Sequence, residues 1–451
     1  MRDILLTLIV FGLSLWVLTR SSIGVLVWSW LGYMNPHRLC YGFARSFPFS
    51  ALIAAATLIS FFVSKEKKTM HWTPVTVLLI IWVLWMCLTT AFAVFPDNAI
   101  EELKRTLKIQ LMIFLTLILM NDRKKLEALV WVIALSIGFY GIKGGLFAIL
   151  HGFNYRIWGP EDSFIGGNNE IALALVMIIP LFRYLQLYAK NKYIRYAMGA
   201  SILLLCCAVL SSYSRGAWLA GGMMGIFFII NSKQKFRIII AVLIIAPILY
   251  SALPSKWFER LDTIESYEDD GSAMGRINAW HFAFNFSKDH PVMGGGYGTF
   301  NRQLFYIYAP EPENYHDAHS IIFEVLGEQG YVGLAIFLSL GLLTFLSIYW
   351  IYMNTRGSPE LEWCRDLSLM IFASLIGYIT GGMFVGLAYF DLPYHLIVMV
   401  VIIRQHVKQF KQSSQHHGRG SGPGIENEKA EVTPATANGL ARRNKLGVRI
   451  D

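Results

Sequence analysis

Charged side chains are scarce in this sequence, where Asp, Glu, Lys and Arg together make up 15% of 451 residues. Soluble domains carry about 25%, so the composition excludes an ordinary soluble protein. Apolar runs of roughly 18 residues or more recur along most of the chain, and such runs can cross the hydrocarbon layer of a membrane. Because a backbone in lipid must satisfy its own hydrogen bonds, we predict an all-α, polytopic integral membrane protein.

Cysteine is also rare, with five residues that show no framework spacing. This excludes a disulfide scaffold and a cysteine-based zinc site. The formal net charge of +9 would suit nucleic acid in a soluble protein. Here the excess cations lie in short loops and in the C-terminal tail, where they set membrane topology. We therefore expect no nucleic-acid partner.

Cationic connections alternate along the chain. Four short connections carry Lys and Arg at every second loop, which is the positive-inside pattern of cytoplasmic loops. They contain Lys65, Lys67 and Lys68; Arg123, Lys124 and Lys125; Lys190, Lys192 and Arg195; and Lys233, Lys235 and Arg237. The segments between and after them are then outside, namely 95–104, 151–170, 211–215 and 251–330.

The same pattern gives a span count. Ten spans are expected from Thr73 onward, and the first 64 residues must hold an even number if the N-terminus is cytoplasmic. Ile4–Tyr33 is interrupted at Thr19–Ser22, so it forms one broken span or two short ones. The first apolar run lacks a small-residue cleavage site, and we expect it to be retained. The prediction is about twelve transmembrane helices.

Four segments follow from this topology: an N-terminal transmembrane bundle over 1–250, a large periplasmic loop over 251–330, C-terminal transmembrane helices over 331–404 and a disordered cytoplasmic tail over 405–451. The tail has few large apolar residues and cannot bury enough surface to fold. Within the large loop, Ala279–Asn285 and Ile321–Leu326 carry helical signals. We expect short helices joined by turns there, rather than a separate globular domain.

Arg215 stands at the outer end of one predicted span and the start of the next, in Ser214-Arg215-Gly216-Ala217. A charge at membrane depth is costly and needs a partner. One interpretation is an interfacial anchor that extends to the headgroups. The other is a phosphate clamp, in which the guanidinium fork, the hydroxyls of Ser211, Ser212 and Ser214 and the next helix N-terminus bind one anion.

Three further cations are candidates. Arg276 follows an acidic stretch and precedes an aromatic helix, although on its own it is an ordinary exposed arginine. Arg156, two residues before Trp158, either contacts phosphate or sugar or only anchors its loop. Lys143 lies inside an apolar span near its outer end, as a functional residue or as a side chain that extends to the surface.

His319 ends a polar turn before an apolar, helix-like run. Histidine holds or releases a proton near neutral pH, which suits a general base acting on a hydroxyl. Glu324 would orient it only if the local helix turns appropriately, and His316 would share its helical face. A metal site on the two histidines lacks a third ligand at a recognisable spacing. The alternative is a structural histidine that caps the helix.

Together these residues resemble the O-antigen ligase and polymerase superfamily of bacterial envelope enzymes. The resemblance rests on short motifs in a fixed order, at Ser214–Ala217, Gly275–Trp280, Gly294–Gly298 and Ala318–Glu324. The segment Met34–Arg38 looks like the ligase subgroup associated with exosortase systems. The resemblance covers about residues 1–405.

The resemblance implies a GT-C-like glycosyltransferase that needs no metal or other cofactor. It would move a glycan from undecaprenyl pyrophosphate to lipid A–core of lipopolysaccharide, at the periplasmic face of the bacterial inner membrane. On this chain, Arg215 and Arg276 would hold the pyrophosphate, and His319 would take the proton of the acceptor hydroxyl, with inversion. Further substrate contacts are expected from Arg156, Tyr315, His316 and Glu324. We expect a monomer among membrane lipids.

Three other functions stay open at this point. An O-antigen polymerase would use the same donor with a second lipid-linked glycan as acceptor, and a protein O-oligosaccharyltransferase would use a protein. A transporter would also have about a dozen spans, with Lys143 and Arg183 along its path. The sequence shows no internal repeat, which argues against the transporter.

Overall fold

The computed structural model describes residues 1–232, 234–262 and 271–419. Every regular element in these ranges is a helix. The chain divides into one compact unit, Met1–Lys408, and a second, Gln409–Asp451. Of the second unit, the described part is the end of one helix. Lys233 and residues 420–451, on which parts of the topology and tail predictions fall, lie outside the described residues.

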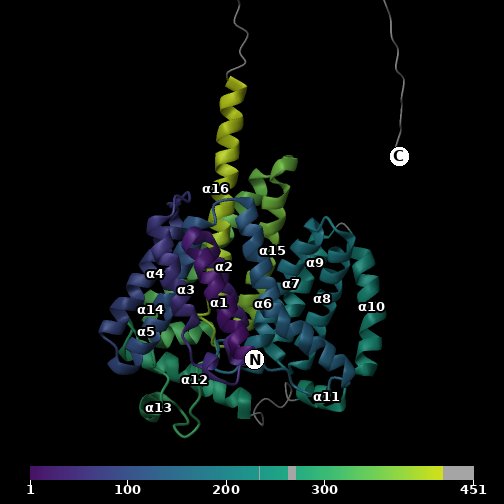
Figure 1. Ribbon diagram of the computed structural model, residues 1–451. Coiled ribbons are helices and arrows are strands. Elements are labelled where there is room, and N and C mark those ends of the chain that lie inside the picture. Colours follow the sequence, from purple (N-terminus) through teal and green to yellow (C-terminus); the bar gives the residue numbers. More distant parts are fainter. Residues whose placement is uncertain (233, 263–270, 420–451) are drawn as a thin grey trace, which may run out of the picture. The chain divides into compact units, whose positions relative to one another are not determined.

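The longest connections between helices lie between α2 and α3, between α6 and α7 and around the large loop (Figure 1). In chain order they are α1 (Arg2–Thr19), α2 (Ser21–Met34), α3 (Phe49–Val63), α4 (Pro74–Ala91), α5 (Pro96–Leu119), α6 (Arg123–Leu150), α7 (Asn168–Tyr188), α8 (Lys192–Ser211), α9 (Arg215–Asn231), α10 (Lys235–Ala252), α11 (Ser255–Asp262), α12 (Gly271–Asp289), α13 (Arg302–Tyr308), α14 (Ile321–Asn354), α15 (Glu362–Gly382) and α16 (Asp391–Arg419). Short 3-10 turns lie at Pro36–Leu39 (η1), Phe43–Arg45 (η2) and Pro359–Leu361 (η4).

Six of these helices are long and apolar enough to cross a membrane by length and composition: α1, α4, α6, α7, α8 and α14. The shorter α3 is also apolar. α7 is largely buried inside the bundle, whereas α1 exposes most of its side chains. The architecture is that of a multi-pass membrane protein, while the count of twelve spans and the GT-C-like topology stay predictions.

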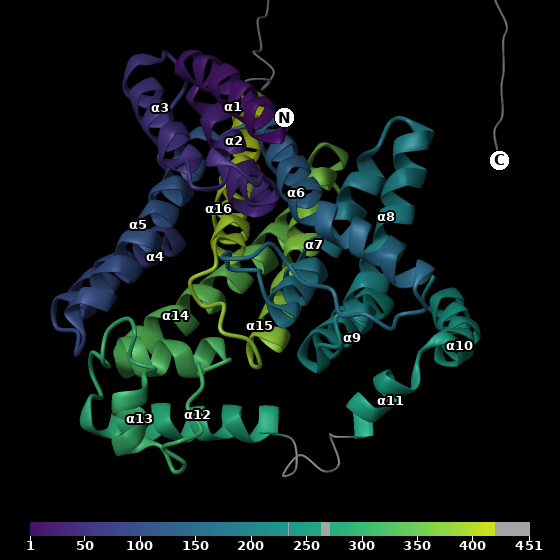
Figure 2. The ribbon, with the colours of Figure 1, turned by 60° about the horizontal axis from the view of Figure 1, so that its bottom comes forward.

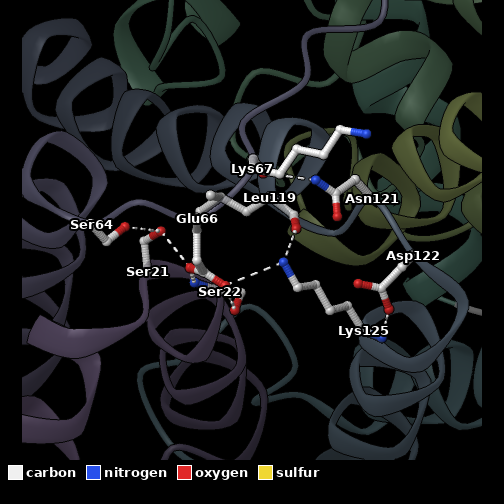
Figure 3. A network of polar contacts seen from close by, with 9 residues as sticks. All are labelled: Ser21, Ser22, Ser64, Glu66, Lys67, Leu119, Asn121, Asp122 and Lys125. Atoms are coloured by element: carbon white, nitrogen blue, oxygen red, sulfur yellow. Dashed lines mark hydrogen bonds and ion pairs between the residues drawn. The ribbon is translucent and has the colours of Figure 1, made fainter.

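Two of the cationic connections meet at a network of polar contacts around Glu66 (Figure 3). Glu66, between α3 and α4, accepts hydrogen bonds from the backbone N–H and the hydroxyl of Ser22 and from the hydroxyl of Ser21 at 2.6–2.8 Å. Its carboxylate also lies 3.2 Å from the ammonium of Lys125, at the start of α6. The neighbouring Arg123 stacks on Tyr188, at the end of α7. Three of the four cationic connections therefore lie together, as the alternation predicts.

The first 64 residues form three helices. α1 and α2 are separate because Arg20 between them is extended, with φ −144° and ψ 107°. The carboxylate of Asp3, at the start of α1, accepts hydrogen bonds from the N–H groups of Gly42 and Ala44, between α2 and α3. Since α2 begins at the cationic end, the start of α1 lies at the opposite end (Figure 1). The first 64 residues thus contain three helices, and not the even number expected for a cytoplasmic N-terminus.

The large loop forms helices α11 to α13 at the end opposite the cationic connections (Figure 2). α12 and α13 share a small aromatic core with the residues that precede α14. Its buried members are Ala279, Phe282, Ala283, Phe286, Phe300, Leu304, Phe305 and Ala318. The side-chain amide of Asn278 donates to the carbonyl oxygens of Glu311 and Asn314, at 2.8 and 2.9 Å. These contacts fix the approach of the chain to His319.

A break in α14 is held by the glycine-rich segment Gly294–Gly298. Gly330 has φ 68° and ψ −175°, which interrupts the helix. This residue lies at the predicted boundary between the large loop (251–330) and the C-terminal transmembrane helices (331–404). The N–H of Gly295 donates to the carbonyl oxygen of Gly327 at 3.0 Å, and the N–H of Gly296 donates to the carbonyl oxygen of Glu328 at 2.9 Å. Carbonyl groups at a helix end need such partners. The glycine-rich segment thus anchors the short part of α14 that precedes the break.

The last helix extends further than the predicted end of the transmembrane region at 404. α16 continues to Arg419, so the first part of the segment expected to be a disordered tail is helical. Similarly, the predicted outside loop 95–104 is helical from Pro96, where α5 begins. Proline favours the first turn of a helix, and charged side chains there remain exposed at the surface.

Candidate functional site

Arg215 is the first residue of α9, directly after a tight turn from α8. The hydroxyl of Ser214 caps α9 by accepting a hydrogen bond from the N–H of Ala217. The hydroxyls of Ser211 and Ser212 donate to the carbonyl oxygens of Tyr155 and Val209. All three serines are buried. The expectation that they offer hydroxyls to a ligand is therefore corrected, because they form and anchor the turn that places Arg215.

Arg215 and Arg276 line one cavity of about 430 Å³, which we call the arginine cavity. Arg215 comes from the start of α9 and Arg276 from the second turn of α12. The remaining lining is mostly apolar and consists of Gly216, Leu219, Ala273, Ile277, Trp280 and Phe384. The structure thus brings together two arginines that lie 61 positions apart in the sequence (276 minus 215).

His319 lines a second cavity of about 280 Å³, the histidine cavity. Its φ of 41° lies in the left-handed region, which few non-glycine residues adopt. The next residue, Ser320, is the N-cap of α14. Five carboxylates and one arginine share the lining, from Glu102, Glu170, Asp317, Glu324, Glu328 and Arg105. Aromatic side chains complete it, from Phe164, Tyr297, Phe300 and Tyr389.

The two cavities are adjacent through α12. Trp280 lines the arginine cavity, and its indole N–H donates to the carbonyl oxygen of Ala318 at 2.9 Å, one residue before His319. Burial lowers the pKa of His319, and the positive charge of Arg276 lowers this pKa further, partly opposed by Asp317. Arg276 therefore acts on His319 electrostatically while sharing a cavity with Arg215.

The other predicted contacts have distinct positions. His316 packs its ring against Gly275, where a Cβ would collide with it. The hydroxyl of Tyr315 donates to the carbonyl oxygen of Phe300 at 3.0 Å, so this tyrosine supports the aromatic core. Glu324 lines the histidine cavity, and its carboxylate accepts a hydrogen bond from the N–H of Ala388 at 3.1 Å. The sequence prediction that Glu324 orients His319 stays a prediction.

Arg156 lies apart from the other predicted residues. It lines a third cavity, together with Lys143, and its guanidinium lies over the ring of Tyr213 at 6.0 Å. The hydroxyl of Tyr213 donates to the carbonyl oxygen of Phe153, which ties the loop of Arg156 to the turn before Arg215. Arg156 is thus linked to the arginine cavity through this turn without lining it.

Sequence analysis identified Glu324 but missed Glu102, Arg105 and Glu170 of the histidine cavity. Glu102 and Arg105 belong to the charged start of α5, and Glu170 to the first turn of α7. Acidic residues are common near helix N-termini because the helix dipole favours negative charge there. Their presence in the sequence therefore did not indicate a functional site. The described residues contain no group of three or more side chains suited to a metal ion.

Two family models match the chain. Residues 200–338 match a family described as O-Antigen ligase. Residues 1–190 match a family of unknown function, DUF5935. A comparison with curated proteins gives no match. The arginine cavity and His319 lie mainly in the first matched segment, whereas Glu102, Arg105 and Glu170 bring the second segment to the histidine cavity.

Proposed function

The chain belongs to the O-antigen ligase family, and we propose that it transfers a glycan from undecaprenyl pyrophosphate to a sugar hydroxyl of lipid A–core. The observation that carries this proposal is the position of Arg276. It lines the same cavity as Arg215, which suits an anionic leaving group, and its charge acts on His319, which suits a base. Donor and acceptor would meet between the two cavities.

The arginine cavity would hold the pyrophosphate. Two guanidinium groups can neutralise a diphosphate through paired hydrogen bonds. The N-terminus of α9, which starts at Arg215, adds its dipole to the same anion. Fixed cationic donors in a largely apolar cavity stabilise the charge that develops as the glycosidic bond breaks. The proposed reaction accordingly needs no metal ion or other cofactor.

An apolar groove supports binding of the polyprenyl chain. It has a volume of about 270 Å³ and lies between α14, α15 and the start of α16. It begins at Ile321 and Ile322, two and three residues after His319, and continues past Phe337 and Leu338. A lipid chain in this groove would place its pyrophosphate near the start of α14.

His319 would act as the general base. Because burial and Arg276 lower the pKa of His319, its ring is neutral at pH 7 and can accept a proton. The acceptor hydroxyl gives its proton to this ring while its oxygen attacks the anomeric carbon. The bond between that carbon and the pyrophosphate oxygen breaks, and undecaprenyl pyrophosphate leaves with both electrons of the bond. One displacement inverts the anomeric configuration.

The histidine cavity would receive the acceptor sugar. Carboxylates such as Asp317 and Glu170 can accept hydrogen bonds from sugar hydroxyls, and aromatic rings such as Phe164 and Tyr389 offer apolar faces. Tyr315 and His316 would support this wall. Both cavities lie at the end away from the cationic turns, so the positive-inside rule supports a periplasmic site in the bacterial inner membrane.

Disruption of the gene tests the assignment against its alternatives. The proposal expects loss of glycan from lipid A–core and accumulation of long glycan chains on undecaprenyl pyrophosphate. Accumulation of single repeats would identify a polymerase instead, and loss of glycan from proteins alone would identify a protein oligosaccharyltransferase. Re-expression of the chain should restore the wild-type pattern, whereas re-expression of His319→Ala should not.

A further inference from the structure

The third cavity, which contains Arg156 and Lys143, is the largest of the four described above, at about 600 Å³. It lies between the η1–η2 region, the end of α6 and the connection between α6 and α7. All of these parts belong to residues 1–190, the segment of unknown function. Pockets for small organic ligands occupy roughly 300–1,000 Å³, so this cavity has the size to hold more than a lone ion.

Four cations line this cavity, from Arg38, Arg45, Lys143 and Arg156. Two of them have carboxylate partners, because Arg38 lies 3.0 Å from Asp162 and Arg45 lies 2.9 Å from Glu161. Both carboxylates are largely exposed, and exposed ion pairs contribute little to stability. Within the described part of the chain, neither Lys143 nor Arg156 forms an ion pair, so the cavity keeps an excess of positive charge.

Lys143 is placed to meet the headgroup of a membrane lipid. It lies seven residues before the end of α6, within the predicted outer half of a membrane span. Leu135 and Phe139 precede it by eight and four residues and are exposed apolar side chains. Residues four apart share one face of a helix. An acyl chain could therefore lie along this face, with its anionic headgroup at Lys143.

The rim of the cavity is aromatic. Tyr41 is 87% exposed and Trp158 is 58% exposed, and both line the cavity. Aromatic rings with one polar atom are suited to a membrane interface and to the apolar faces of sugars. A phosphate alone needs no such rings. The rim thus favours a headgroup that combines phosphate with sugar.

From these observations we infer that the cavity binds a phosphorylated glycolipid of the outer leaflet. Lys143 and Arg156 contact the phosphate, while Tyr41 and Trp158 contact the sugar. The same connection that lines this cavity at Pro160 and Glu161 lines the histidine cavity at Phe164. The bound glycolipid would therefore sit beside the proposed acceptor site. A role of the bound glycolipid as the acceptor rests on the proposed function, whereas binding of the glycolipid to this cavity does not.

Binding of diphosphoryl lipid A to the purified full chain in nanodiscs tests the inference, with phosphatidylglycerol and inorganic phosphate as separate probes. The double variant Lys143→Gln/Arg156→Gln should weaken lipid A binding at least about tenfold, since each lost contact is a charge-assisted hydrogen bond. The matched variant Lys104→Gln/Lys288→Gln removes the same charge from exposed side chains of α5 and α12 and should bind as the wild type does.

Several outcomes would overturn the inference. Equal lipid A binding by the Lys143/Arg156 variant and the wild type would remove the site. Equally tight binding of phosphatidylglycerol would show a phospholipid site, and equally tight binding of inorganic phosphate would show a simple anion site. Transfer kinetics are measured separately. A raised KM for the acceptor with an unchanged kcat in the Lys143→Gln/Arg156→Gln variant supports the acceptor role. If the wild type transfers no glycan, the proposed function fails while the binding result still stands.

Discussion

At the scale of the residue, the environment of His319 determines how the proposed reaction depends on pH. A base works in its neutral form, and a lowered pKa keeps the ring neutral to lower pH. We therefore expect the acid limb of kcat/KM to lie below 6.5, the ordinary pKa of histidine. Activity falls only as the pH drops through this lowered value. A pH profile of transfer in detergent checks the prediction, and an acid limb above 6.5 would contradict it.

Asp317 provides the matched change for this profile. Its negative charge raises the pKa of His319, against burial and the charge of Arg276. The variant Asp317→Asn should therefore move the acid limb to lower pH, whereas Glu313→Gln, which removes an exposed carboxylate paired with Arg302, should leave it in place. If both variants leave the profile unchanged, the acid limb of kcat/KM does not reflect the titration of His319.

Arg215 allows a test of geometry at constant charge. Arg215→Lys keeps one positive charge but loses the planar fork that binds two phosphate oxygens. We expect kcat/KM for the lipid-linked donor to fall roughly 100-fold, the loss typical of one removed transition-state donor. The same replacement at Arg302, whose side chain is 78% exposed, should have no effect. Full activity of Arg215→Lys would show that this residue is only an interfacial anchor.

Glu66 is expected to stabilise the fold at the end away from the site. Burial raises its pKa, but the hydrogen bonds from Ser22 and Ser21 and the charge of Lys125 outweigh this and lower the pKa to about 2 (Figure 3). A depressed carboxylate pKa stabilises the folded state above the unfolded value of about 4.3. That stabilisation is lost as the pH falls from there through about 2.

The variant Glu66→Gln removes this charge. We expect it to lower the free energy of unfolding at pH 7 by roughly 2 kcal/mol, because hydrogen bonds to a charged group are lost. Thermal unfolding in detergent measures the change. Glu101→Gln, at an exposed ion pair with Lys104, is the control and should change little. Equal stability of both variants would show that the Glu66 network is not important for the fold.

At the scale of the element, the break in α14 sets the position of His319. Gly294 has φ +64°, and a Cβ there would lie within 2.6–2.7 Å of backbone atoms around Gly327–Gly330. Gly294→Ala should therefore destabilise the protein by about 1–3 kcal/mol, as measured by thermal unfolding. Gly225→Ala, in the middle of α9 with open space around it, should be neutral or slightly stabilising. Equal effects of the two changes would argue against the anchoring role of Gly294.

The elements show what sequence could and could not predict. Apolar runs predicted helices because lipid requires them, and the start of α9 at Arg215 followed from the polar turn before it. The fixed-order motifs led to the ligase family. The role of Gly294–Gly298 could not be predicted, since it depends on the distant break at Gly330. The serines before Arg215 were misassigned because a hydroxyl that caps a helix and one that binds a ligand look alike in sequence.

At the scale of the whole described unit, function depends on contacts between segments far apart in the chain. The histidine cavity joins α5, α7 and α14, and the arginine cavity joins α9 and α12. A single sequence does not show which helices are neighbours, so Glu102, Arg105 and Glu170 escaped notice. The two family segments meet around His319, and Gly386 and Tyr389, which lie outside both segments, complete the lining.

Reconstituted transfer tests the central claim most directly. Purified chain in detergent is supplied with an undecaprenyl-pyrophosphate-linked glycan, lipid A–core and a chelator, and the anomeric configuration of the product is determined by NMR. We predict glycan on lipid A–core with inverted configuration, loss of product in His319→Ala, and wild-type folding of that variant by size-exclusion chromatography. Wild-type transfer by His319→Ala, or retention of configuration, would contradict the account.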